Sequence, residues 1–153
     1  MKENTLKLLL LWDSKIPQNS ENLLKEKLEK ISPENLSILE KLPLKNPNIA
    51  LILCVFFGIF GIEDFYRNRN KLGILKLVLT AIALFLTMIV YIIVDEFDGV
   101  YVMSPQMIYL LVIFAMILFF IVAVLVVINL FTISECVKKD NLTLIDKYIA
   151  MIE

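Results

Sequence analysis

Two long runs of apolar residues limit the fold of this chain more than any other feature of its sequence. The first run covers Ile74 to Val94 and the second covers Met107 to Ile128, and Lys76 is the only charged residue in either of them. About 20 apolar residues suffice for a helix to cross the roughly 30 Å hydrocarbon core of a bilayer. Both runs are therefore predicted to be membrane-spanning helices.

The composition supports the same interpretation. Of the 153 residues, 59% are hydrophobic and 20% are charged, whereas a soluble domain has roughly 45–50% apolar residues. A soluble fold of this length has too little interior to bury so much apolar surface. We expect an all-α membrane protein that contacts the lipid bilayer, with a small N-terminal helical module followed by a bundle of two to three transmembrane helices.

A third apolar segment, Ile49 to Ile62, is shorter. Its length is more typical of a re-entrant or buried segment, but Asn48 before it and the aromatic pair Phe65 and Tyr66 after it extend it toward both interfaces. We expect this segment to cross the bilayer, with a re-entrant segment as the alternative. Lys76 lies near the start of its run, so its flexible stem is expected to carry the ammonium group to the lipid headgroups.

The charged residues predict the orientation. Residues 95–106, between the two long runs, include three acidic residues and no Lys or Arg, so this segment is expected outside. Positively charged residues remain on the cytoplasmic side, here Arg67, Arg69, Lys71, Lys138 and Lys139. The N-terminal 48 residues then lie outside if the short segment crosses and inside if it is re-entrant.

The region before the membrane predicts two short helices. Ser20 is a candidate N-cap for residues 21–30, and Ser32, followed by Pro33 at the first helical position, is one for the next helix. Apolar residues recur at helical spacing in both: Leu23, Leu24, Leu28, Ile31, Leu36, Leu39 and Leu42. Such a stripe must be buried, either within the module or at the bilayer surface, or else against a partner protein.

These observations divide the chain into three regions. Residues 1–47 form the amphipathic N-terminal module, residues 48–134 form the transmembrane domain with segments near 49–66, 73–94 and 107–133, and residues 135–153 form a polar C-terminal tail. The chain has no dense cluster of Lys and Arg, which argues against a nucleic-acid partner. It has no histidine, and Cys54 and Cys136 are isolated, so we expect no metal site and no cofactor.

One stretch is specific enough to indicate a family. Residues Asn46 to Leu77, NPNIALILCVFFGIFGIEDFYRNRNKLGILKL, resemble the core of the two-transmembrane domain family, here called the TM-two domain. The helical prefix over residues 23–47 resembles that of bacterial members. The resemblance implies a loop motif used for packing or interaction, formed by Gly58, Gly61, Glu63, Asp64, Phe65, Tyr66, Arg67, Asn68, Gly73 and Lys76.

The chain also departs from the family pattern. Glu63 is followed by Asp64 where the family has Asp or His followed by Arg, and Arg67, one turn on, is the candidate replacement for that missing cation. Asn68 stands where a turn glycine is expected, and Asn tolerates left-handed backbone. The end of the second family helix matches either Asp95 or Asn129. Under the first match, residues 107–133 are an added helix.

The sequence favours a non-catalytic role. The spans contain no paired carboxylates and no Ser with a base, and Glu63, Asp64, Arg67 and Arg69 are expected to form a solvated loop, or otherwise a docking point for a partner or an anionic lipid. We expect an integral membrane interaction or regulatory protein that binds a protein partner or forms homo-oligomers. The alternative is a small oligomeric channel or transport accessory subunit with a path lined by Thr80, Thr87, Tyr91 and Asn129.

Overall fold

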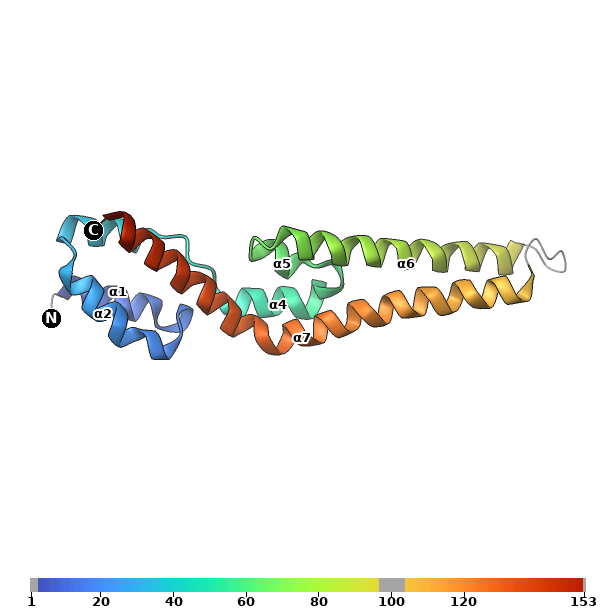
Figure 1. Cartoon of the computed structure of the whole chain (residues 1–153), viewed down its shortest axis with the longest axis horizontal. Coiled ribbons are helices and arrows are strands. Elements are labelled where there is room, and N and C mark those ends of the chain that lie inside the picture. The colour runs from blue at the N-terminus through green and yellow to red at the C-terminus, as the bar shows by residue number, and fades with distance from the viewer. Residues whose placement is uncertain (1–2, 97–103, 153) are drawn as a thin grey trace. The chain divides into compact units, whose positions relative to one another are not determined.

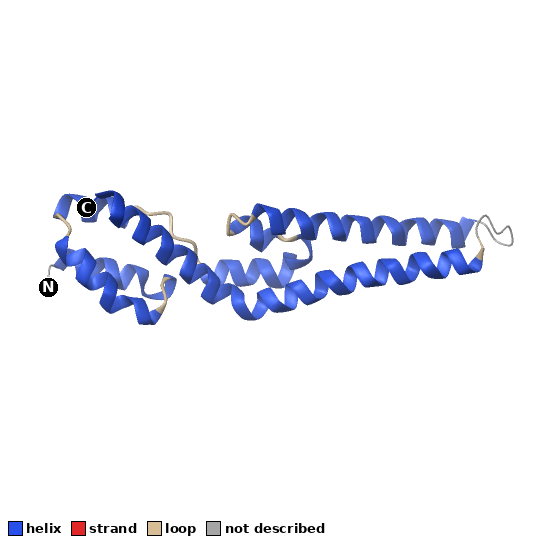
Figure 2. Ribbon diagram, in the orientation of Figure 1, coloured by secondary structure: helices blue, strands red, loops and turns tan. Residues whose placement is uncertain are grey.

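In a computed structural model, which describes residues 3–96 and 104–152, the protein is built from helices (Figures 1 and 2). No strand occurs in these two ranges, which confirms the predicted all-α class. The elements are α1 (Glu3–Trp12), η1 (Asp13–Lys15), η2 (Gln18–Ser20), α2 (Glu21–Lys30), α3 (Pro33–Glu40), α4 (Pro47–Phe57), η3 (Gly58–Phe60), α5 (Ile62–Tyr66), α6 (Asn70–Glu96) and α7 (Pro105–Ile152).

The chain divides into two compact units. The terminal unit combines Met1–Ile52 with Thr132–Glu153, and the central unit is Leu53–Phe131. Two helices are long and apolar enough to cross a membrane, over Asn70–Val94 of α6 and within Pro105–Ile152 of α7. Only 11% and 17% of their most apolar windows are buried in the protein. A core helix of a soluble protein is largely buried, so this exposure fits lipid-facing helices.

Of the two predicted helix N-caps, Ser32 is confirmed and Ser20 is not. Ser32 caps α3 as expected, because its extended backbone lets Oγ accept a hydrogen bond from the Asn35 backbone N–H at 3.5 Å, and Pro33 occupies the first turn. Ser20 precedes α2, but its side chain does not cap that helix. Its backbone is already helical (φ −93°, ψ −9°) at the end of η2, and its hydroxyl donates instead to Pro17 O at 2.5 Å.

The terminal unit has a core built from both ends of the chain. The N-terminal helices supply most of the buried side chains, and α7 supplies Ile145 and Ile149; the other members are Leu8, Trp12, Ile16, Leu24, Leu28, Ile31, Leu36 and Leu39. Full burial of one such side chain contributes roughly 1.5–3 kcal/mol. The apolar stripe of the module is therefore buried within the protein, apart from Leu23, which is exposed. Residues 135–152, expected as a polar tail, are helical and complete this core.

Asn141 of α7 joins three segments of the terminal unit. Its side chain is 2% exposed, and Nδ2 donates to Lys15 O at 2.9 Å and to Lys45 O at 2.8 Å. Oδ1 accepts from the Lys45 backbone N–H at 2.9 Å. One amide thus satisfies backbone groups at the end of η1 and in the linker before α4, groups that are costly to bury unpaired.

The shared core decides how many times the chain crosses the membrane. Side chains on opposite sides of a bilayer cannot pack together, so α2 and the C-terminal end of α7 lie on the same side. The number of crossings is therefore even. If α6 and α7, the two helices long and apolar enough to span, each cross once, the segment 49–62 returns to the side from which it enters. The expected crossing therefore stays a prediction, and the shared core favours the re-entrant alternative.

Contacts within the central unit show where this segment turns. Helix α4 has 11 residues, about 16 Å at 1.5 Å per residue, or half of a ~30 Å hydrocarbon core. Ile59, just after α4, lies beside Thr80 of α6, and Glu63 lies beside Lys76, one turn nearer the start of α6. The chain therefore reverses between these points. Residues 95–106, expected outside, lie largely outside the described ranges.

The role of Asn141 can be tested through Trp12, the only tryptophan and a member of the terminal core. Asn141→Ala should lower the stability of this unit by about 1–3 kcal/mol, because buried backbone groups lose their partners. The measurement is thermal unfolding of the detergent-solubilised chain followed by Trp12 emission. Thr143→Ala, which removes only an exposed hydroxyl bonded to Lys139 O, should leave the midpoint nearly unchanged. Equal midpoints for both variants would contradict the bridging role.

The crossing number can be tested by labelling single cysteines in intact cells with a membrane-impermeant maleimide. In a background without Cys54 and Cys136, cysteines at the exposed positions Asn22 and Lys147 should show the same accessibility, and a cysteine at Ser104 the opposite one. A different response at Asn22 and Lys147 would mean that the short segment crosses.

Candidate functional site

The loop motif begins with a turn that depends on glycine. Gly61 has φ +72°, a left-handed conformation that L side chains rarely adopt. A Cβ on Gly61 would lie 2.8 Å from Gly73 O, and one on Gly73 would lie 2.9 Å from the Phe65 ring. Both glycines therefore allow α5 to pack closely on α6. Asn68 has φ 63°, as expected for a residue that replaces a turn glycine.

The turn places two carboxylates against one lysine. Lys76 Nζ donates to Glu63 Oε1 at 2.5 Å and lies 2.7 Å from Asp64 Oδ2. The side chains are 3%, 0% and 0% exposed, respectively. Lys76, a residue of α6, is thus a cation that contacts both carboxylates.

This arrangement corrects two expectations from the sequence. Lys76 does not extend to the headgroups, and Glu63 and Asp64 do not belong to a solvated loop. The physical reason is that the reversal of the chain after α4 brings both carboxylates next to Lys76, where pairing compensates for the loss of water. Arg67 is also buried, at 7% exposure, whereas Arg69 is exposed.

Helix α7 adds a fourth polar side chain. Asn129 Nδ2 donates to Glu63 Oε1 at 3.1 Å and to Asp64 Oδ2 at 3.4 Å. Residues from α5, α6 and α7 therefore meet in one set, here called the buried charge cluster: Glu63, Asp64, Lys76 and Asn129. Asn129 was not among the residues expected at this site. The available signal was its position as a polar residue at the end of an apolar run, where such residues commonly face other helices.

A second polar contact holds the turn beside the cluster. Thr80 is 1% exposed, and its Oγ1 donates to Ile59 O at 2.6 Å. Ile59 lies in η3, where the helix of α4 has ended and a carbonyl lacks a helical partner. Thr80 satisfies that carbonyl, so its hydroxyl is used inside the protein.

The remaining motif residues support this packing. Gly58 is buried, and a Cβ there would lie 2.9 Å from Val126 of α7. Phe65 and Tyr66 are partly buried. Free Cys54 is also buried, with Sγ 3.9 Å from Val126 O. Across the described residues, no group of three or more His, Cys, Asp or Glu side chains is arranged to hold a metal ion.

The buried charge cluster pairs most of its own polar atoms. Among the residues that the structure describes, two carboxylate oxygens, Glu63 Oε2 and Asp64 Oδ1, have no hydrogen-bond partner. The other two are shared by the lysine and the amide. A buried ion pair adds little net stability, because desolvation offsets the Coulombic gain, but the loss of one partner is strongly destabilising. The arrangement therefore serves to hold α5 in place.

Residues 43–95 match the TM2 domain family, which is the TM-two domain named from the sequence. The matched region contains α4, α5, α6 and all ten residues of the loop motif. It ends at Asp95, so it favours the interpretation in which residues 107–133 are an added helix. No curated protein and no solved structure matches the chain.

The cluster can be tested by replacing its cation. Lys76→Met should destabilise the central unit by about 3–5 kcal/mol, because two buried carboxylates lose their counter-charge. Buried Cys54 reports the opening of this unit, and the measurement is the temperature at which it reacts with a fluorogenic maleimide in a Cys136→Ser background.

The control is Lys71→Met, at an exposed lysine next to the turn. It should leave the reaction temperature nearly unchanged. A triple variant, Lys76→Met with Glu63→Gln and Asp64→Asn, should recover most of the loss. If Lys76→Met behaves like Lys71→Met, the lysine does not hold the turn.

Proposed function

We propose that this protein, which carries a TM2-domain segment over residues 43–95, is a non-catalytic interaction protein anchored in a membrane. In this proposal α6 and α7 hold the chain in the bilayer, and the terminal unit binds a partner protein. The observation that carries it is the core shared by α1, α2, α3 and the end of α7. A terminal region with its own core is a folded body that can present a fixed surface.

The outer faces of the terminal unit support a binding role. Leu10, Leu23 and Ile38 are 69%, 53% and 51% exposed, although the same three helices bury other apolar residues in the core. Leu10 also lines one cavity together with Leu6 and Leu9, and grouped apolar residues mark interaction surfaces, whereas single exposed ones are common. Such exposure is costly in water unless a partner covers it.

The buried charge cluster supports the non-catalytic part of the proposal. A catalytic acid or base must reach its substrate, but Glu63, Asp64 and Lys76 are buried and contact one another. The densest set of ionisable groups in the central unit is thus engaged in holding α5.

The proposed location is a bacterial cytoplasmic membrane with the terminal unit on the cytoplasmic side. The support is the resemblance of residues 23–47 to the prefix of bacterial members, together with Arg69, Lys71, Lys138 and Lys139, which remain inside by the positive-inside rule. Both ends of the chain share one core, so this orientation places them together in the cytoplasm.

The channel alternative has less support. A hydroxyl that lines a path must face water, but Thr80 donates to Ile59 O and Thr87 donates to Ala83 O. Asn129 is engaged with Glu63 and Asp64. Of the expected lining residues, Tyr91 and Thr87 have exposed side chains, whereas Thr80 is buried and Asn129 is partly buried.

The proposal can be tested by photo-crosslinking in native membranes. Benzoylphenylalanine is placed at Leu10, Leu23 or Ile38 of the terminal unit, with Phe85 of α6, which is 64% exposed, as the matched lipid-facing control. At least one terminal position should form a discrete adduct with one protein, identified by mass spectrometry, and Phe85 should form none. The absence of a protein adduct at all three terminal positions would reject a docking role.

A further inference from the structure

The terminal unit has a groove between α1 and α2 that its own side chains do not fill. Its volume is about 430 Å³, within the range of roughly 300–1,000 Å³ that is typical of binding pockets. Leucine side chains of α1 form its apolar part, and charged residues of η1 and α2 form its rim. The residues used below are Leu6, Leu9, Leu10, Asp13, Glu21 and Lys25.

The apolar part of the groove exists because α1 is apolar on two faces. Leu8 and Trp12, four residues apart, are 2% and 3% exposed and belong to the core. Leu6 and Leu10 are also four residues apart, yet they are 45% and 69% exposed. Side chains at this spacing lie on one face of a helix. A helix that is apolar on two faces is normally covered on both, so the second face of α1 lacks a partner.

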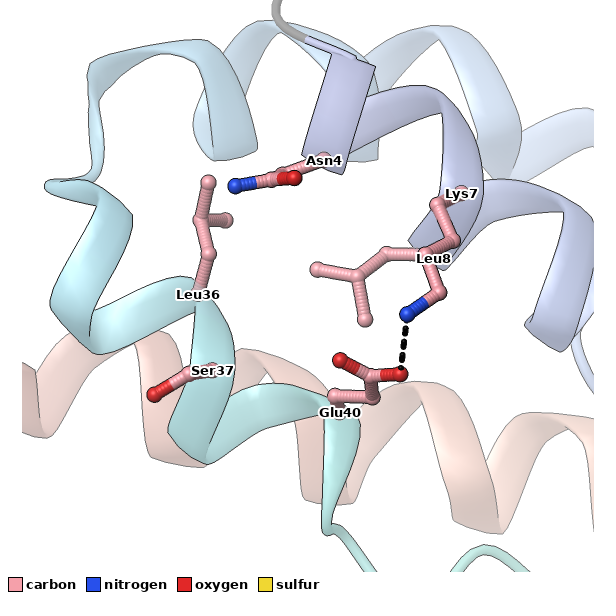
Figure 3. Close-up of a pocket in the computed structure, with 6 residues that line it drawn as sticks. All are labelled: Asn4, Lys7, Leu8, Leu36, Ser37 and Glu40. Atoms are coloured by element: carbon pink, nitrogen blue, oxygen red, sulfur yellow. Dashed lines mark ion pairs between the residues drawn. The ribbon is translucent and has the colours of Figure 1, made fainter.

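A second cavity on this unit is too small to bind the side chains of a partner protein. It lies between α1 and α3, has a volume of about 80 Å³, and is lined by Leu8, Leu36 and four polar residues (Figure 3). An ion pair of 2.8 Å joins Lys7 and Glu40 across it. This volume accommodates a few waters but not the side chains of a partner.

The charges at the groove favour a protein over a lipid surface. Asp13 and Glu21 supply two carboxylates at the rim against the single ammonium group of Lys25. In the described ranges, neither carboxylate takes part in a salt bridge, so both are available to a cation. Anionic membrane surfaces attract Lys and Arg and repel an acidic rim. A concave apolar groove accepts the apolar face of a helix.

We propose that the groove between α1 and α2 binds an amphipathic helix of a partner protein. The apolar side chains of that helix, spaced by three or four residues, contact Leu6, Leu9 and Leu10, and its Lys or Arg side chains pair with Asp13 and Glu21. This assignment rests on the proposed function and specifies the surface and the partner chemistry.

The test uses the full chain in phosphatidylcholine nanodiscs and two fluorescent peptides of about 14 residues, long enough to form a helix. One peptide combines a leucine face with lysines, and the other has the same leucines with glutamates. Fluorescence anisotropy, corrected for binding to empty nanodiscs, should show that the lysine peptide binds and the glutamate peptide does not. Asp13→Lys with Glu21→Lys should reverse this preference.

Substitution of two neighbouring leucines of α1, one inside the groove and one outside it, tests where the peptide binds. Leu10→Ser should weaken binding of the lysine peptide roughly tenfold, because a central apolar contact is lost. Leu11→Ser, at a leucine that is 48% exposed but does not line the groove, should have little effect. Both positions are exposed, so both variants should keep the folded unit, as checked by Trp12 emission.

Two results would overturn the assignment. In one, Leu10→Ser and Leu11→Ser weaken binding equally, or the two peptides bind equally well. In the other, a nitrobenzoxadiazole probe on Leu10→Cys shows membrane-like emission in nanodiscs containing phosphatidylserine before any peptide is added, which means that the bilayer covers the groove. If photo-crosslinks form at Leu23 or Ile38 while the groove fails these tests, the docking role stands and its surface lies elsewhere.

Discussion

The contact of Lys76 with Glu63 and Asp64 is the interaction on which the central unit depends. Two adjacent carboxylates, both fully buried, require a counter-charge, because an isolated buried carboxylate costs far more than folding can offset. That requirement places α5 at the level of Lys76 on α6. The close approach at Gly61 and Gly73 and the Thr80 hydrogen bond to Ile59 follow from the same placement. The chain can then reverse its direction after α4.

The core of the terminal unit requires both ends of the chain to lie on one side of a bilayer. Ile145 and Ile149 of α7 enter the core of the N-terminal helices. Asn141 reinforces this assembly through three hydrogen bonds to backbone groups of Lys15 and Lys45. With an odd number of crossings, these residues would lie on opposite sides of the bilayer, and neither the core nor the bridge would form.

The two units therefore use their polar and apolar groups in opposite ways. In the central unit, buried ionisable side chains pair with one another, while apolar side chains such as Phe85 and Phe120 are exposed, as lipid contact requires. In the terminal unit the core is apolar, and the polar groups are mainly on the outside. Leu6 and Leu10 depart from that rule, and they line a groove with Asp13 and Glu21, which form no salt bridge within the described part of the chain. This combination suits recognition of a basic amphipathic helix.

The sequence by itself determined the helical class, the two long spans and the loop motif, because apolar length and glycine spacing act locally. It also predicted that Ser32 caps a helix and that the backbone of Asn68 is left-handed. Only the tertiary structure decided the environment of Lys76, the contribution of Asn129 and the return of the short segment. An apolar segment near the minimum spanning length has no local preference between crossing and turning back. That choice depends on partners far along the chain, namely the ammonium of Lys76 and the core residues Ile145 and Ile149.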